Sequence, residues 1–393
     1  MLALAVALVL GASPWLTTGE ARARLAEQSP LEVVDRSQPD RPQYGLRLDS
    51  AALRSLVPVG LGRTVAGRRV WRSFRFDGQA YDQLTAGRYR FAFTFAPTTV
   101  GGAVSGLRGP PASSFQPGLP LRAIFYYDWF PEGWTQENGI FPFSKYHPSL
   151  GYYDSGDPKI VRRHVQAMLY GRLAVGIYDW WGIGTNHDQR FPTALAVART
   201  TSLHWALVYE PEGYGDPGVD RLRADLEYLR DRYAAKPAYL KLDGRFVVVA
   251  YGQRRETCAM VDRWLAANES SHAWLVLKAF DGYERCPRQP DGWYEFSGNQ
   301  YEYRLGNDFF GISAGYEKTG AQVAPALPRI SVDGWRKAAE DLVASGTRNQ
   351  FVISFNEWGE ASAIESATEW ATPSGYGAYL DVLHQVFPAV PGG

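Results

Sequence analysis

Two glutamates with the spacing of a catalytic pair lie near the C-terminus, in residues 354–360, which read Ser-Phe-Asn-Glu-Trp-Gly-Glu. On a strand Glu357 and Glu360 would point to opposite faces, but in the turn that opens a helix their carboxyl groups come within about 5 to 6 Å of each other. This spacing suits the retaining cleavage of a glycosidic bond and leaves little room for the water of simple inversion. We therefore predict that both are catalytic; the alternative is two glutamates that form ion pairs or cap a helix.

Side chains that could bind a sugar follow other apolar runs in the C-terminal two thirds of the chain. Aromatic rings pack on the C–H faces of pyranoses and carry polar tips for hydroxyl groups. The predicted substrate-binding residues are Tyr127, Asp179, Trp181, Glu210, Tyr251, Asn299, Tyr301 and Trp358. The alternatives are a core position for each aromatic ring and, for Asp179, a role in holding a loop.

The elements that must position these residues are short apolar runs that alternate with segments of helical periodicity from residue 121 onward. This alternation is typical of a parallel sheet built from βα units. The predicted strands are 122–127, 173–179, 203–209, 246–251, 274–280, 293–297, 309–315 and 351–356, with no clear helix between the sixth and seventh. Eight units close a (β/α)8 TIM barrel, an α/β fold whose active site lies at the C-terminal ends of the strands.

The first 120 residues differ from the barrel in composition. Residues 1–23 hold an apolar run followed by small residues and resemble a secretory signal, with a buried apolar helix as the alternative. Residues 24–100 contain short strand-like runs, among them an aromatic run at 89–95 that alternates at period two, and predict a small β-rich module. Residues 101–120 are predicted to form a Gly/Pro/Ser linker, and 121–393 the catalytic barrel. We therefore expect a secreted or cell-envelope protein without a stable membrane span in the mature chain.

Composition restricts the partners of the protein. The 393 residues carry 41 basic and 41 acidic side chains, so their formal net charge is zero and no nucleic-acid surface is expected. The chain has no CxxC and no HExxH motif, and we predict neither a metal nor a cofactor. An oligosaccharide or polysaccharide is the expected partner, while the oligomeric state stays open.

The two cysteines fall in neighbouring βα units. Cys258 begins the helix after the fourth predicted strand, and Cys286 lies in the loop after the fifth, so both belong to the same barrel rim. An exported protein meets oxidising conditions in which a disulfide persists. We predict a disulfide between them, with two independent thiols as the alternative.

The order of the motifs resembles glycoside hydrolase family 99, the endo-α-mannosidase and endo-α-mannanase family. The matching segments are Tyr-Tyr at 126–127, His-Pro at 147–148, Gly-Tyr-Tyr-Asp-Ser at 151–155 with Asp157, Gly-Ile-Tyr-Asp-Trp-Trp-Gly at 176–182, Tyr-Glu-Pro at 209–211, 354–360, and Ile-Glu at 364–365. The resemblance covers about residues 121–388. It departs at Gly359 and Ala361, where the family commonly has His and Gly, and at residues 236–237, where Lys-Pro replaces the usual His-Pro.

The resemblance implies an endo-acting retaining hydrolase of α-linked, by default α-mannosidic, glycans without a conventional protein nucleophile. Glu357 would take the proton of the sugar 2-hydroxyl, which attacks C1 to give a 1,2-anhydro sugar, and Glu360 would protonate the leaving oxygen. Trp181 and Glu210 would contact the sugar next to the cleaved bond. The alternative is a non-catalytic carbohydrate-binding protein, or one that assembles cell-envelope polysaccharide, on the same barrel.

Overall fold

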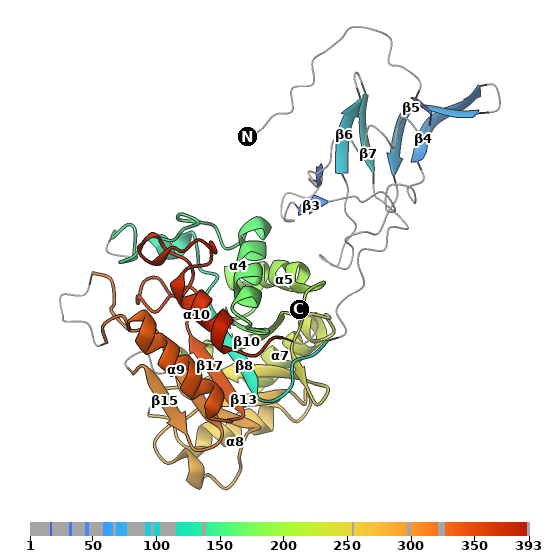
Figure 1. The fold of residues 1–393 in the computed structure, drawn as a ribbon. Helices are drawn as coiled ribbons and strands as arrows, with labels where there is room; N and C mark the ends of the chain where they lie inside the picture. Colours follow the sequence, from blue (N-terminus) through green and yellow to red (C-terminus); the bar gives the residue numbers. More distant parts are fainter. Residues whose placement is uncertain are drawn as a thin grey trace. The chain divides into compact units, whose positions relative to one another are not determined.

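The computed structural model describes residues 115–390 apart from 136–138, 254, 297–299 and 321–326, and in the first 114 residues only the backbone of several strands. The chain divides into two compact units, Met1–Pro111 and Ala112–Gly393. Figure 1 shows the course of the chain through both units, each of which we describe by itself.

The described strands of the first unit pair in antiparallel fashion. They are β1 (Leu16–Thr17), β2 (Leu31–Val33), β3 (Tyr44–Leu46), β4 (Pro58–Val65), β5 (Arg68–Phe76), β6 (Phe91–Phe95) and β7 (Thr98–Gly102). β5 lies between β1 and β4, whereas β2 pairs with β3 and β6 with β7. The alternating run of aromatic residues that predicted a strand in this region falls on β6.

The second unit contains the predicted barrel. Its parallel strands are β8 (Leu121–Tyr126), β9 (Val175–Trp180), β10 (His204–Tyr209), β12 (Arg245–Ala250), β13 (Trp274–Lys278), β14 (Gly292–Tyr294), β16 (Phe309–Ser313) and β17 (Asn349–Ile353). They are hydrogen-bonded in the order β14-β13-β12-β10-β9-β8-β17-β16, so the sheet is nearly closed between β14 and β16. The predicted eight strands and the fold class are confirmed.

Helices cover the outside of this sheet (Figure 1). They are α4 (Pro158–Tyr170), α5 (Asn186–Ala198), α6 (Pro211–Gly215), α7 (Val219–Leu229), α8 (Cys258–Ala267), α9 (Val332–Ala344) and α10 (Ala378–Val386). α4 begins after the N-cap residue Asp157, whose Oδ1 accepts the Lys159 backbone N–H at 2.8 Å. Between β14 and β16 the chain forms β15 (Glu302–Leu305), antiparallel to β16, in place of a helix.

One further strand pairing and several short turns complete the barrel unit. β11 (Lys241–Leu242) adds an antiparallel edge to β12. A π-helical turn, Arg230–Ala234, extends α7, and 3₁₀ turns occur at Glu132–Trp134, Tyr283–Arg285 and Thr368–Trp370. No helix in the described part of the chain is long and apolar enough to cross a membrane.

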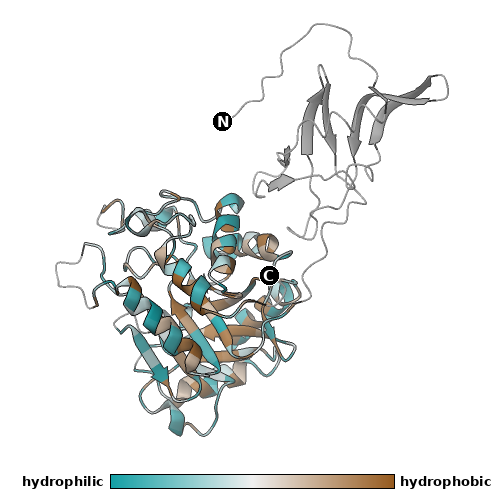
Figure 2. Cartoon of the chain, in the orientation of Figure 1, coloured by the Kyte–Doolittle hydropathy of each residue, from teal (hydrophilic) through white to brown (hydrophobic). Residues whose placement is uncertain are grey.

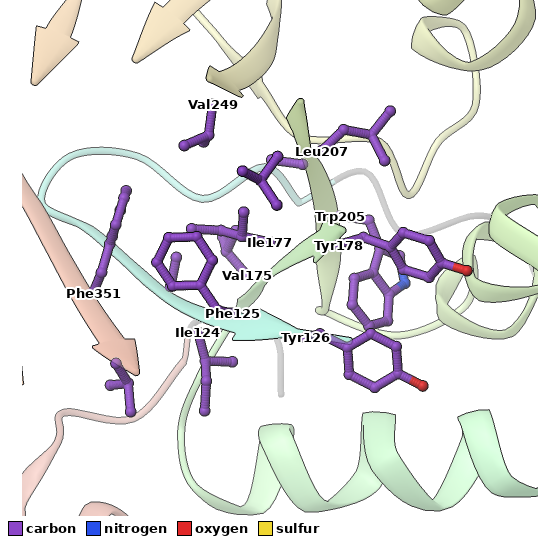
Figure 3. Packing of buried hydrophobic residues seen from close by; sticks show 14 of the residues in the cluster. Ile124, Phe125, Tyr126, Val175, Ile177, Tyr178, Trp205, Leu207, Val249 and Phe351 are labelled. Carbon is purple, nitrogen blue, oxygen red and sulfur yellow. The ribbon is translucent and has the colours of Figure 1, made fainter. Parts of the chain in front are cut away.

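The core lies on both sides of the barrel strands, which explains why successive residues of these strands are apolar. Figure 2 shows apolar residues on the strands and polar ones on the outer helix faces. Phe125 and Phe351 meet inside the barrel at 5.9 Å between ring centroids, whereas Tyr126 and Trp205 pack outside it at 5.0 Å (Figure 3). Gly176 makes room for Trp205, because a Cβ there would lie 2.2 Å from the indole ring. Both sides of each strand are therefore buried, which fits the continuous apolar runs in the sequence.

Candidate active site

A cavity opens at the C-terminal ends of the barrel strands. Its lining combines aromatic rings with three carboxyl groups. The lining residues are Phe125, Tyr127, Trp129, Trp181, Val208, Glu210, Tyr214, Tyr251, Phe296, Glu357 and Glu360. The cavity thus lies where a (β/α)8 barrel places its chemistry.

The two predicted catalytic glutamates lie in a turn that follows β17. The Glu357 backbone N–H donates to Ser354 Oγ at 2.9 Å, and Glu357 Oε1 accepts the Glu360 backbone N–H at 3.1 Å. This turn does not open a helix, contrary to the sequence prediction, because Ala361 takes a left-handed backbone conformation with φ of 58° and redirects the chain. The turn alone is enough to bring both side chains to the cavity.

Burial and proximity change the proton affinity of this pair. Burial raises the pKa of Glu357 well above its ordinary value, and the charge of Glu360 raises it further. Burial also raises the pKa of Glu360, against the opposing charge of Lys318. Because two neighbouring carboxylates resist double ionisation, the pair retains a proton at higher pH than isolated glutamates do. One proton donor and one proton acceptor can therefore coexist in this pair.

Tyr127 and Asn356 connect the first and last strands of the barrel at the cavity. The Tyr127 backbone N–H donates to Asn356 Oδ1 at 2.8 Å, and Asn356 Nδ2 donates to the Tyr127 carbonyl at 2.7 Å. The Tyr127 ring stacks on Trp129, with 4.5 Å between centroids. This double hydrogen bond fixes the turn that carries Glu357 and Glu360 relative to the aromatic wall.

Glu210 supplies the third carboxyl group of the cavity. Its pKa is raised to about 8, chiefly by burial and also by the charge of Asp179, against the opposing effect of His187. A carboxyl group that is partly protonated near neutral pH can both donate and accept hydrogen bonds. Glu210 is thus suited to bind sugar hydroxyls.

Behind the cavity, Asp128, Asp179 and His187 form a buried charge cluster. The Asp128 backbone N–H donates to Asp179 Oδ1 at 2.9 Å, and His187 Nδ1 pairs with Asp128 and, at 3.3 Å, with Asp179 Oδ2. Burial lowers the pKa of His187, but the two aspartates outweigh this effect and raise it to about 10. Burial and Asp179 raise the pKa of Asp128 to about 7. The histidine is therefore a cation near neutral pH.

The same cluster could in principle hold a metal ion, because one ligand atom from each of its three residues lies within 4.8 Å of the others. Protonated His187 already balances the two carboxylates, so a metal would have to displace its proton. The contact of the cluster with the cavity is made by Asp179, whose Oδ2 accepts the Trp181 indole N–H at 3.3 Å.

The structure brings most of the predicted site residues together. Tyr127, Trp181, Glu210 and Tyr251 line the cavity with Glu357 and Glu360. Asp179 is fully buried and lies behind Trp181, outside the lining. Asn299 lies outside the described residues.

Trp358 and Tyr301 are placed away from the cavity, contrary to the sequence prediction. The Trp358 indole N–H donates to Tyr153 Oη at 3.1 Å and to Glu365 Oε2 at 3.2 Å, and the ring is fully buried. Trp358 thus contacts Tyr153 and Glu365, whereas Glu357 and Glu360 line the cavity. The Tyr301 hydroxyl donates to the Pro328 carbonyl at 2.9 Å, which ties the loop before β15 to another loop.

Several lining residues were not among the predicted substrate-binding residues. Trp129 lies three residues after the end of β8, so its position after a predicted strand could have identified it as a lining residue. Tyr214 belongs to α6 and lies beyond the residues that immediately follow β10, so its position relative to the strand did not predict that it lines the cavity. Phe125 and Phe296 look like core residues in the sequence, since each belongs to or follows an apolar strand.

The predicted disulfide is confirmed. Cys258, the first residue of α8, is bonded to Cys286, and their Cα atoms are 5.3 Å apart. The bond joins the βα units of β12 and β13 at the rim that carries the cavity.

Comparisons with known proteins agree with this geometry. Residues 124–274 match Glycosyl hydrolase family 99. A segment of 108 residues is 26% identical to glycoprotein endo-alpha-1,2-mannosidase of Mus musculus and covers 26% of this chain and 23% of that protein. The glycoprotein endo-alpha-1,2-mannosidase-like protein of Homo sapiens is 24% identical over 294 residues, or 62% of this chain and 61% of that protein. The chain thus matches less than two thirds of the length of either relative.

The fold is similar to that of a solved GH99 endo-alpha-mannosidase from Bacteroides thetaiotaomicron in complex with BIS-TRIS-Propane. The TM-score is 0.54 at 18% sequence identity, and the match covers 68% of this chain and 95% of that chain. Over residues 124–274 the chain is therefore similar to glycoside hydrolase family 99, and it shares its barrel fold with the solved structure.

Proposed function

We propose that the protein is an endo-acting glycoside hydrolase that cleaves α-linked glycans, with α-mannosides as the first substrates to test. The observation that carries this proposal is the position of Glu357 and Glu360 in one cavity with Tyr127, Trp181 and Glu210. A protein that only binds sugars has no need of two neighbouring carboxyl groups with raised pKa values. The names of the related mannosidases support the choice of sugar.

In the mechanism that we propose, Glu357 removes the proton of the sugar 2-hydroxyl, and the resulting oxygen attacks C1 as the bond to the leaving oxygen breaks. Glu360 donates its proton to that leaving oxygen. Glu360 then takes a proton from water, which opens the 1,2-anhydro sugar at C1, and Glu357 returns its proton to O2. Two displacements at C1 preserve the α configuration.

The raised pKa values of the pair support a reaction that needs one protonated and one ionised carboxyl group, whereas the division of roles between Glu357 and Glu360 rests on the family resemblance. When both carboxyl groups are protonated at low pH the base is lost, and when both are ionised at high pH the acid is lost. Activity should therefore pass through a maximum as the pH is varied. On the alkaline side of this maximum, activity falls as the pair loses its last proton. Because burial raises both pKa values, this maximum lies at higher pH than ordinary glutamates would give.

We also propose that the protein is exported. An apolar, signal-like segment at residues 1–23 and the disulfide between Cys258 and Cys286 support this location, since such bonds persist in oxidising compartments.

The decisive experiment is incubation of the full chain with α-mannans, α-glucans and N-glycan fragments, with released oligosaccharides read by mass. We expect products from an α-mannoside and an α anomer in the proton NMR spectrum of the first product. Glu360→Gln should lower turnover of substrates with poor leaving groups by at least about a hundredfold while it preserves binding, because only proton donation is removed.

Two results would contradict this assignment in different ways. A β anomer in the first product would mean inversion and a different role for Glu357. Binding without product from any α-glycan would favour the non-catalytic carbohydrate-binding protein.

A further inference from the structure

Tyr214 is a large aromatic side chain that lies on the cavity wall and is nevertheless 67% exposed. It belongs to the five-residue helix α6, which follows Glu210. Its ring centroid is 4.9 Å from that of Trp181 and 6.2 Å from that of Tyr251. The three rings form a continuous aromatic wall that leads from the carboxyl groups toward the surface.

α6 is anchored from the side opposite its exposed tyrosine. Glu212 is fully buried, accepts the Trp264 indole N–H at 2.9 Å and pairs with Arg263. The Gln253 side-chain amide donates to the Gly213 carbonyl. The backbone that carries Tyr214 is therefore held by buried polar contacts although the tyrosine ring itself remains open to solvent.

The neighbouring ring, Tyr251, is fixed relative to α6. A Cβ on Gly213 would lie 2.3 Å from Tyr251 Cδ1, so the helix backbone packs directly on that ring. The Lys278 ammonium lies 5.4 Å from the centroid of the Tyr251 ring and pairs with Glu295 Oε1 at 3.2 Å. Because both supports are built into the barrel, the Tyr251 ring and the α6 backbone that carries Tyr214 are held relative to each other before any ligand binds.

The chemistry of Tyr214 fits a neutral sugar. Its hydroxyl makes no hydrogen bond with the residues that the structure describes, and partial desolvation at the cavity wall together with the charge of Glu210 raises its pKa. The hydroxyl therefore stays protonated and can donate to a sugar oxygen, while the ring face can pack on pyranose C–H groups. An exposed ring held in this way contributes little to the stability of the fold.

We propose that Tyr214 binds a sugar unit remote from the cleaved bond, so that the enzyme selects α-linked oligosaccharides of three or more units over disaccharides. The inference rests on the proposed function, since it extends the same cavity. Trp181 and Tyr251 line the path that leads away from the carboxyl groups. Tyr214 therefore adds contact area only for a sugar chain that is long enough to reach it.

The test compares chain lengths in the full-length enzyme. The ratio of kcat/KM for an α-mannotetraose to that for an activated α-mannobioside is measured for the wild type, Tyr214→Ala and Tyr214→Phe. We expect Tyr214→Ala to lower this ratio about fivefold to tenfold through a higher KM for the longer substrate, and Tyr214→Phe to keep most of it, because the ring face is retained. Phe141→Ala, which removes an exposed ring outside the cavity, is the matched control and should leave the ratio unchanged.

Binding of the same oligosaccharides to Glu360→Gln protein, followed by calorimetry, separates this inference from the proposed function. If nothing is hydrolysed but Tyr214→Ala still weakens tetraose binding more than biose binding, the inference holds and the proposed reaction is wrong. An equal loss for both lengths, or no loss for either, overturns the inference while hydrolysis stands. Absence of both binding and hydrolysis overturns both proposals.

Discussion

At the scale of single residues, His187 has no role in the proposed reaction, but its positive charge stabilises two buried aspartates behind the cavity. Its imidazolium balances Asp128 and Asp179, and Asp179 in turn accepts the Trp181 indole N–H. The folded-state pKa of about 10 lies above the ordinary value of 6.5. The stability that this charge contributes is therefore complete below about pH 6.5 and is lost as the pH rises toward 10.

We predict that Asp179→Asn lowers the pKa of His187 by about 1 to 3 pH units, because an opposite charge at this distance favours the protonated ring. The measurement is a histidine NMR titration of the full chain, in which exposed His147 serves as an internal reference. An unchanged midpoint for His187 in this variant would show that Asp179 does not hold the charge.

At the scale of elements, the turn that carries Glu357 and Glu360 depends on a glycine that contacts a loop from elsewhere in the sequence. A Cβ on Gly359 would lie 2.3 Å from Phe143 Cε1 and 3.1 Å from Glu357 Oε1. Phe143 is buried, so its ring cannot simply swing into solvent. The space beside residue 359 is thus filled by the Phe143 ring, which leaves no room for a side chain there.

Gly359→Ala should destabilise the fold by about 1 to 3 kcal/mol and lower kcat, because the clash displaces either Phe143 or Glu357. Combining it with Phe143→Leu should recover part of both losses. Gly118→Ala, whose Cβ would meet nothing within 4 Å, is the control. Thermal unfolding and initial rates check the prediction, which fails if Gly359→Ala and Gly118→Ala behave alike.

At the scale of the whole molecule, the disulfide joins two neighbouring βα units of the barrel across 28 residues of sequence. A closed loop of this length stabilises the folded state by about 3 to 4 kcal/mol in the chain-entropy model. The bond also ties α8, which packs against α6 through Trp264 and Glu212, to the next unit of the rim. Its effect on stability is therefore expected to reach the cavity wall.

Reduction should lower the melting temperature of the wild type by several degrees and leave a Cys258→Ser/Cys286→Ser variant unaffected. Calorimetry with and without reductant measures this difference. Equal melting temperatures of the wild type under both conditions would mean that the bond contributes nothing to stability.

The sequence alone determined the barrel and the acid pair. Apolar runs of strand length alternating with helical segments predicted all eight strands to within three residues at either end, because strands buried on both faces must be apolar throughout. The spacing of Glu357 and Glu360 within a turn is local, so it too could be predicted. The signal-like segment and the sugar remain predictions, since neither depends on a contact that the described residues make.

Only the tertiary structure decided which side of each rim element faces the cavity. Trp358 lies between the two glutamates in sequence but is fully buried against Tyr153, whereas Tyr214, beyond the end of β10, reaches the wall. His187 meets Asp128 across 59 residues of sequence. These outcomes depend on the direction that a turn gives to each side chain and on which helices and loops pack together, and periodicity along one strand or helix carries no information about either.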